Sequence, residues 1–239
     1  MSRVLLVRHA QASFLELDYD KLSTLGETQA RALGKYWAQR KQHFDRICSG
    51  PCLRQRDSAR IVGGACRDAG LNFPEPAVME EFDEYQGEAV IKRALPELVE
   101  TDPFIRDLYQ HFLNVRSPAE RSKPFQKLFE VVIGKWVCGE ISVSGVESWS
   151  DFCARVNSGL SRFLSGARHG EQSAIFCSGG PIAVAVQRAL NLSAQDTLRV
   201  AWMSRNCSYS EFLYSGERFT LSAFNAFPHL DDASLLTYR

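Results

Sequence analysis

The sequence predicts an α/β fold in three layers, α/β/α, with a mostly parallel central sheet and a helical cap insertion. Short apolar runs that are typical of buried strands alternate with longer segments of helical character over most of the chain. Val4–Val7 is one such run, too short for a helix, and it predicts a central strand. Ser173–Cys177 is another, and it leads directly into the glycine pair Gly179–Gly180 and a helix.

The remaining elements are expected in the following order. We expect a helix over about 24–40 capped by Ser23 or Thr24, a strand at 46–49, and a helix over 52–69 that ends at Gly70. A short strand at 77–79, a long helix over 147–165 and a helix over 182–190 with Pro181 in its first turn follow. Residues 207–214 and 218–225 alternate in polarity, which predicts a hairpin or adjacent edge strands.

Residues from about 85 to 145 differ in character from the segments on either side. They combine helical patterns with several prolines. A length of 239 residues fits one large domain with a sizeable insertion. We therefore interpret the chain as a single α/β domain over 1–239, with a helical cap inserted at about 85–145 over the carboxyl edge of the sheet.

Composition excludes several classes of function. The 28 Lys and Arg residues balance the 28 Asp and Glu residues, so no overall field favours nucleic acid or an anionic membrane. The chain has no run of 18 apolar residues, and its seven cysteines are odd in number and lack CxxC pairs. These features predict reduced thiols and a cytoplasmic protein without a structural metal or a cofactor. Oligomeric state stays open at this point.

Two residues at the end of the first strand carry the main chemical signal. Arg8 and His9 follow the apolar run, at the carboxyl end of a strand, where ligands bind in open α/β sheets. An imidazole there can attack phosphorus or a carbonyl carbon, and a guanidinium can hold two anionic oxygens. Arg54, in the first turn of the second helix, adds to an anion site. Taken singly, each is also compatible with an ordinary polar surface position.

Two further segments allow both a structural and a functional interpretation. Four carboxylates lie within Glu80–Glu84, where a solvated loop is expected, or a general acid whose pKa is raised by a nearby phosphate. The turn at Ser178 and Gly179 can be an ordinary strand-to-helix connection, or it can present backbone amides to an anion.

In this order, the segments resemble the histidine phosphatase superfamily, which includes cofactor-dependent phosphoglycerate mutases and acid phosphatases. The resemblance covers nearly the whole chain and rests on the motifs Val4–Ala10, Leu25–Gly34, Gly50–Ala59, Met79–Glu81 and Asn206–Ser208. It implies the corresponding three-layer fold. The chain departs from the family pattern at Ala10, where glycine is usual, and at Ser178, where the family has a second histidine.

The resemblance assigns roles to particular residues. It implies that His9 attacks phosphorus and forms a phosphohistidine, which water then hydrolyses. Arg8 and Arg54 would bind the phosphoryl oxygens. The resemblance does not supply the rest of the phosphate pocket, where the Ser178 hydroxyl and the Gly179 amide are the donors we expect from their chemistry. Glu81, which aligns with the family's acid, would protonate the leaving oxygen.

The expected function is that of a metal-independent phosphomonoesterase that acts on a small phosphorylated substrate. The partner is that substrate or inorganic phosphate, and activity is expected to be reduced because Ser178 replaces a histidine. The alternative is a catalytically impaired module that binds phosphate or a partner, motivated by Ala10 and Ser178. A phosphoglycerate mutase is disfavoured, because a mutase must retain its phosphoenzyme in a full, closed pocket.

Overall fold

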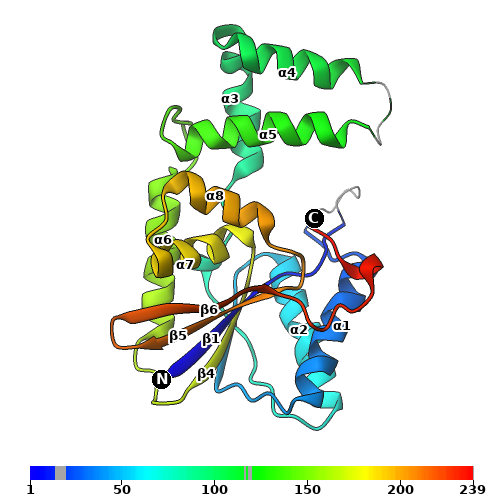
Figure 1. The fold of residues 1–239 in the computed structure, drawn as a ribbon, viewed down its shortest axis with the longest axis vertical. Coiled ribbons are helices and arrows are strands. Elements are labelled where there is room, and N and C mark those ends of the chain that lie inside the picture. Colours follow the sequence, from blue (N-terminus) through cyan, green and yellow to red (C-terminus); the bar gives the residue numbers. More distant parts are fainter. Residues whose placement is uncertain (14–19, 116, 118–119, 239) are drawn as a thin grey trace. The chain divides into compact units, whose positions relative to one another are not determined.

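The computed structural model describes residues 1–13, 20–115, 117 and 120–238 (Figure 1). These residues form two compact units, one built from Met1–Glu84 and Arg155–Arg239, the other from Tyr85–Ala154. Residues 14–19, between His9 and the first helix, lie outside the described residues.

A sheet forms the centre of the first unit. Among the described residues it has six strands in the order β3-β2-β4-β1-β5-β6. The strands are β1 (Ser2–Arg8), β2 (Arg46–Ser49), β3 (Ala77–Val78), β4 (Gln172–Cys177), β5 (Tyr209–Ser215) and β6 (Arg218–Ala226). Strands β1 to β4 pair in parallel, whereas β5 pairs antiparallel with β1 and with β6. The α/β fold with a mostly parallel sheet is therefore confirmed.

Strand β1 has a central place because its side chains are apolar on both faces. The side chains from Val4 to Val7 are at most 3% exposed, as expected for a strand covered on both sides. The strand pairs with β4 on one edge and β5 on the other, and Arg8 lies opposite Cys177. His9, the next residue, therefore leaves the sheet beside the end of β4.

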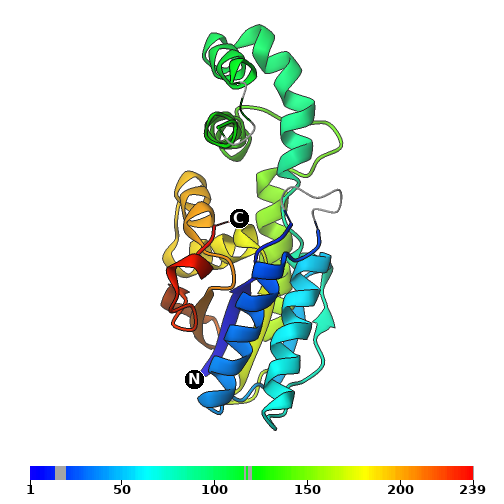
Figure 2. The same cartoon turned by 90° about the vertical axis from the view of Figure 1, so that its right-hand side faces the viewer.

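Helices cover the two faces of this sheet. Helices α1 (Thr24–Gln39) and α2 (Leu53–Asp68) pack on a core cluster that includes Leu5, Val7 and Phe176. Figure 1 shows α6 (Trp149–Leu164) and α7 (Gly179–Leu190) on the opposite side of the sheet, and Figure 2 gives the view at right angles. Helix α7 begins directly after β4, and β4 pairs in parallel with β1, so the amino end of α7 lies close to the carboxyl end of the central strand.

The close packing of α1 depends on two glycines. A Cβ atom at Gly26 would lie 2.1 Å from the carbonyl oxygen of Gln11, and one at Gly34 would lie 2.6 Å from the Cβ atom of Ala65 on α2. Only glycine avoids these clashes. The expected cap is confirmed, because the Ser23 hydroxyl accepts a hydrogen bond from the Gly26 amide at 3.0 Å.

Two elements differ from the sequence-based prediction. Helix α7 begins at Gly179 rather than at about 182, with Ser178 as its N-cap residue. Helix α8 (Ala194–Met203) was not predicted, although Ser193 caps it by accepting from the Asp196 amide at 3.1 Å. Its apolar signal is weak because few of its side chains are buried, namely Thr197, Leu198 and Ala201.

The second unit is helical, in agreement with the expected character of this segment. It contains α3 (Gly87–Thr101), α4 (Pro103–Asn114) and α5 (Ser122–Val137). Its aromatic centre is formed by Tyr85, whose ring centroid lies 5.6 Å from that of Trp136 and 6.1 Å from that of Trp149. That this segment caps the sheet of the first unit stays a prediction.

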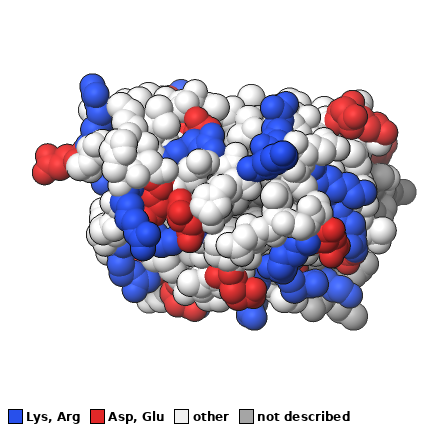
Figure 3. Space-filling model, turned by 90° about the horizontal axis from the view of Figure 1, so that it is seen from below, with Lys and Arg blue, Asp and Glu red and all other residues white. Residues whose placement is uncertain are grey.

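The surface and the cysteines bear on the excluded classes of function. On the face drawn in Figure 3, basic and acidic side chains are interspersed and neither sign gathers. Over the part of the chain that is described, no helix is both long and apolar enough to cross a membrane. All seven cysteines are free.

A buried histidine outside the candidate site makes stability depend on pH. The ring of His229 lies 6.0 Å from that of Tyr36 and 6.4 Å from that of Tyr209, and burial lowers its pKa from 6.5 to about 4. In the unfolded chain the imidazole takes up a proton near pH 6.5, whereas in the folded chain it does so only near pH 4. The free energy of unfolding therefore decreases as the pH is lowered through this range. Between pH 7 and pH 4, chemical denaturation should show a loss that is smaller in His229→Phe by about 3 kcal/mol. Equal losses in both proteins would contradict this.

Candidate active site

The backbone of His9 is fixed between two neighbouring segments. Its amide donates to the Cys177 carbonyl at 2.8 Å, at the end of β4. Its carbonyl accepts from the Cys207 amide at 3.1 Å and from the Asn206 side-chain amide at 3.4 Å. The side chain is 6% exposed. The imidazole therefore stands at a defined place where β1 leaves the sheet.

One ring nitrogen of His9 is engaged by the main chain. The Nδ1 atom lies 2.7 Å from the Ala10 carbonyl oxygen, which can only accept, so we assign the ring hydrogen to Nδ1. The Nε2 atom then carries a lone pair, and it accepts from Arg54 Nε at 3.3 Å. This is the tautomer that leaves Nε2 as the nucleophilic atom.

The surroundings of His9 keep its ring neutral. Burial is the largest cause, and the charges of Arg54 and then Arg8 act in the same direction, so the pKa of His9 lies well below its usual value. The hydrogen bond to Ala10 opposes this shift but is the smallest contribution. A neutral imidazole beside two guanidinium groups can act as a nucleophile toward an anionic ester.

Arg54, in the first turn of α2, contacts a carboxylate from another segment that the sequence analysis did not single out. Its Nη1 atom is 2.7 Å from Oδ1 of Asp20, and Oδ2 of Asp20 accepts from the Leu53 amide at 2.7 Å. The carboxylate thus takes the position of an anion at the amino end of a helix, next to an arginine. It also holds the Arg54 guanidinium in the direction of His9.

Arg8 lies beside the glycine turn that follows β4. Its Nη1 atom donates to the carbonyl oxygen of Ser204, at the carboxyl end of α8. A Cβ atom at Gly179 would lie 3.9 Å from Arg8 Nε. The unpredicted helix α8 therefore takes part in holding one of the predicted site residues, and Arg8 lies beside Gly179 at the amino end of α7.

The turn between β4 and α7 brings two polar groups together. The buried hydroxyl of Ser178 accepts from Gln55 Nε2 at 2.8 Å. The amide of Gly180 donates to Oε2 of Glu84 at 3.1 Å. Glu84 therefore lies at the turn that follows β4.

Glu81 points to a different neighbour. Its Oε2 atom forms an ion pair with Arg162 Nη2 on α6 at 2.6 Å, and a Cβ atom at Gly159 would lie 2.5 Å from its own Cβ. Arg155 holds the loop by donating to the carbonyl oxygens of Glu81 and Asp83 at 3.0 and 3.2 Å. The acidic loop thus directs Glu81 to α6 and Glu84 to the β4–α7 turn.

The structure brings together most, but not all, of the residues singled out from the sequence. His9 and Arg54 are in contact, and Arg8, Ser178 and Gly179 lie around the same strand ends. The sequence analysis did not single out Asp20 or Gln55. It counted Glu84 among four candidate carboxylates, and the contact of Glu84 with the β4–α7 turn distinguishes it from the other three.

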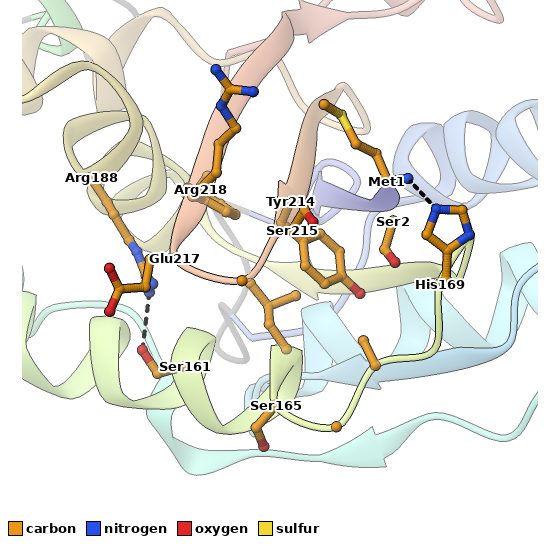
Figure 4. A pocket seen from close by; sticks show the side chains of 15 residues that line it. Met1, Ser2, Ser161, Ser165, His169, Arg188, Tyr214, Ser215, Glu217 and Arg218 are labelled. Atoms are coloured by element: carbon orange, nitrogen blue, oxygen red, sulfur yellow. Dashed lines mark hydrogen bonds between the residues drawn. The ribbon is translucent and has the colours of Figure 1, made fainter.

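A cavity elsewhere in the first unit lacks this combination. It has a volume of about 540 Å³ and lies at the start of β1 and the β5–β6 turn, the opposite end of the strands from His9 (Figure 4). Its polar contacts join the amino terminus to His169 and Arg188 to Ser161, both at 3.1 Å. In the described ranges, no group of three or more His, Cys, Asp or Glu residues is arranged to hold a metal ion.

The order of motifs around His9 matches a known family. Residues 4–116 and 118–226 match the model of the histidine phosphatase superfamily, branch 1. The chain belongs to this superfamily. A comparison with curated proteins finds no significant match.

Solved structures that are similar to this chain include several proteins named as phosphatases or mutases. The mycobacterial glucosyl-3-phosphoglycerate phosphatase is 19% identical, with a TM-score of 0.61 over 95% of this chain and 99% of the other. A phosphoserine phosphatase mutant from Entamoeba histolytica, in complex with phosphoserine, is 18% identical, with a TM-score of 0.59 over 96% and 100%. Phosphoglycerate mutase from Bacillus anthracis is 15% identical, with a TM-score of 0.60 over 96% and 95%. At such identities the likeness supports the superfamily fold alone.

Proposed function

We propose that this protein is a metal-independent phosphomonoesterase that acts through a phosphohistidine at His9. The observation that carries the proposal is the neutral His9 ring, whose Nε2 atom lies 3.3 Å from Arg54 Nε. When a phosphate ester binds, the Arg54 N–H would turn from Nε2 to a phosphoryl oxygen, which frees the lone pair and brings the phosphorus atom in front of Nε2. Membership of the histidine phosphatase superfamily supports the same reaction.

The reaction proceeds in two steps. His9 Nε2 attacks phosphorus, the N–P bond forms and the bond from phosphorus to the leaving oxygen breaks, while that oxygen takes up a proton. Water then attacks the phosphohistidine and gives a proton to the carboxylate that served as acid in the first step, the N–P bond breaks, and inorganic phosphate leaves. Arg8 and Arg54 neutralise the charge that is spread over the phosphoryl oxygens, which is the task a metal ion performs in other phosphoryl-transfer enzymes.

We assign the proton donor to Glu84 in place of Glu81. Glu84 contacts the amide of Gly180 at the turn that ends β4, whereas Glu81 is paired with Arg162. A carboxyl group at this turn can reach an oxygen atom that is bound at the carboxyl ends of the strands. Repulsion by the bound phosphate would favour its protonated form, as a general acid requires.

Ser178 completes the proposed phosphate site, where the superfamily usually has a second histidine. A hydroxyl donor replaces a group that can carry positive charge, so we propose turnover that is reduced but not abolished. The seven free cysteines support a cytoplasmic location. The substrate class we propose is a small phosphorylated metabolite.

A panel of phosphate esters tests the proposal. With p-nitrophenyl phosphate and several alkyl phosphates, phosphate release should persist in excess EDTA and be inhibited competitively by inorganic phosphate. Loss of activity in EDTA that returns on addition of a divalent cation would contradict metal independence. Absence of release from every ester would contradict the phosphatase.

A catalytically impaired phosphate-binding module is the second candidate. Two contacts favour it: Asp20 is paired with the Arg54 guanidinium, and Glu84 accepts from the Gly180 amide. A bound phosphate would have to compete with both carboxylates for these donors. Calorimetry would then show binding of inorganic phosphate, while the ester panel would show no release.

A further inference from the structure

A buried glutamine joins three segments around the candidate site. Gln55, on α2, is 0% exposed, and its Oε1 atom accepts from the Cys52 amide at 3.1 Å. Its Nε2 atom donates to the Phe82 carbonyl at 3.2 Å and to the Ser178 hydroxyl at 2.8 Å. A Cβ atom at position 50 would lie 2.1 Å from Oε1, so Gly50 leaves the space that this amide fills.

The partners of Gln55 fix the direction of every hydrogen bond it makes. The Cys52 amide can only donate, so it must face Oε1, and the Phe82 carbonyl can only accept, so it must face Nε2. The amide therefore presents an N–H group to Ser178, whose oxygen has to accept. The hydroxyl hydrogen of Ser178 must then point away from Gln55.

Ser178 does not use its oxygen for the task usual at its position. An N-cap serine normally accepts from an amide in the first turn of its own helix, but Ser178 makes no such bond with α7. Instead Gly180, in that turn, donates to Glu84. Because Arg8 and Cys177 pair across β1 and β4, Ser178 leaves the sheet at the level of His9. Its hydroxyl therefore lies at the strand ends from which the proposed nucleophile projects.

We infer that Gln55 is a positioning residue for phosphoryl transfer: by donating to Ser178, it keeps the hydroxyl hydrogen available to an oxygen of the transferred phosphoryl group. The inference rests on the proposed function and deepens it. Without Gln55, the Phe82 carbonyl loses its donor and competes for the Ser178 hydrogen. The phosphoryl group would then lose a donor although Ser178 itself is unchanged.

A double-mutant cycle separates this role from a purely structural one. Ser178→Ala should lower kcat/KM by about 10²-fold, the scale of one lost donor to a developing oxyanion. Gln55→Met should lower it by about 10-fold or more when Ser178 is present, and by less than about 2-fold in the Ser178→Ala background. A loss that is equal in both backgrounds would contradict the inference.

The chain offers a matched control in a second buried glutamine. Gln29, on α1, is also 0% exposed, accepts from the Gln11 amide at 2.9 Å and donates to the Leu235 carbonyl at 2.7 Å. Gln29→Met therefore removes a comparable set of buried hydrogen bonds without touching Ser178. Whatever its effect on kcat/KM, that effect should be the same with and without Ser178→Ala.

Gln55→Glu keeps the inference testable if Gln55→Met fails to fold. This variant keeps an acceptor for Cys52, but an ionised carboxylate has no hydrogen to donate to Ser178. Its kcat/KM relative to the wild-type protein should rise as the pH falls, because the protonated carboxyl regains a donor. The same rise in the Ser178→Ala background would overturn the inference.

Orthovanadate binding, measured by calorimetry without substrate, distinguishes this inference from the proposed function. The coupling between Gln55→Met and Ser178→Ala should appear in the dissociation constant for vanadate. Where Gln55→Met does not fold, Gln55→Glu takes its place in this comparison. If the coupling appears there and no ester is hydrolysed, the proposed function fails and the role of Gln55 stands. If esters are hydrolysed and the effects add in both assays, the role of Gln55 fails and the proposed function stands.

Discussion

Glu84→Gln should lower turnover of an alkyl phosphate by roughly 10²–10⁴-fold, the range that general acid catalysis contributes. Turnover of p-nitrophenyl phosphate should fall by less than about 10-fold, because nitrophenolate leaves without being protonated. The substitution keeps the shape of the side chain and an oxygen for the Gly180 amide, and it removes only the titrating proton. Steady-state kinetics with both esters checks the prediction through kcat/KM, which reports the steps up to phosphorylation of His9 whichever step limits kcat.

Two neighbouring carboxylates serve as controls for this assignment. Glu81→Gln should break the ion pair with Arg162, and Asp83→Asn should weaken the hydrogen bond that Asp83 accepts from the Cys52 thiol. In neither variant should the loss of turnover depend on the leaving group. If Glu81→Gln shows that dependence and Glu84→Gln does not, the sequence-based assignment of Glu81 is right and ours is wrong. Equal losses on both esters in Glu84→Gln would indicate that Glu84 only positions the turn.

His9→Ala should lower phosphate release by about 10⁴-fold or more, because it removes the atom that attacks phosphorus, and groups that act as a unit lose most of their effect together. The loss should be in kcat for every ester, whatever its leaving group. Release of phosphate measured at high enzyme concentration checks the prediction.

The effect of His9→Ala has to be separated from unfolding. Thermal denaturation should show a folded variant, because the backbone contacts of His9 with Cys177 and Cys207 do not need the ring. His43→Ala is a matched control, since His43 pairs with Asp45 at the surface away from the site. His43→Ala should keep wild-type turnover, and a comparable loss in both variants would contradict the role of His9.

The fold could be predicted from the sequence because its strongest signals are local. Val4–Val7 is apolar on both faces, and Ser23 and Gly26 begin α1 with a cap that needs no tertiary contact to be recognised. The contact of His9 with Arg54 could also be predicted. His9 follows a strand and Arg54 begins a helix, and both lie at the same edge of a parallel sheet.

The rest depends on contacts that a linear pattern does not contain. Glu81 and Glu84 are three residues apart in one acidic loop, and only the packing of Gly159 and the three carbonyls held by Arg155 decide which of them faces the β4–α7 turn. Asp20 reaches Arg54 from another segment. In the sequence, Gln55 has the character of an ordinary helical residue. Its proposed role depends on Phe82 and Ser178, which are 27 and 123 residues away along the chain.

The most direct measurement of the central claim is detection of the phosphorylated enzyme during turnover. The wild-type protein is mixed with p-nitrophenyl phosphate, quenched in alkali to preserve phosphohistidine, digested, and examined by mass spectrometry. We predict one phosphoryl group on the peptide that contains His9, formed in step with a burst of nitrophenol, and no such peptide from His9→Ala. Steady-state release of phosphate with the phosphoryl group on another residue, or undiminished release by His9→Ala, would contradict the account.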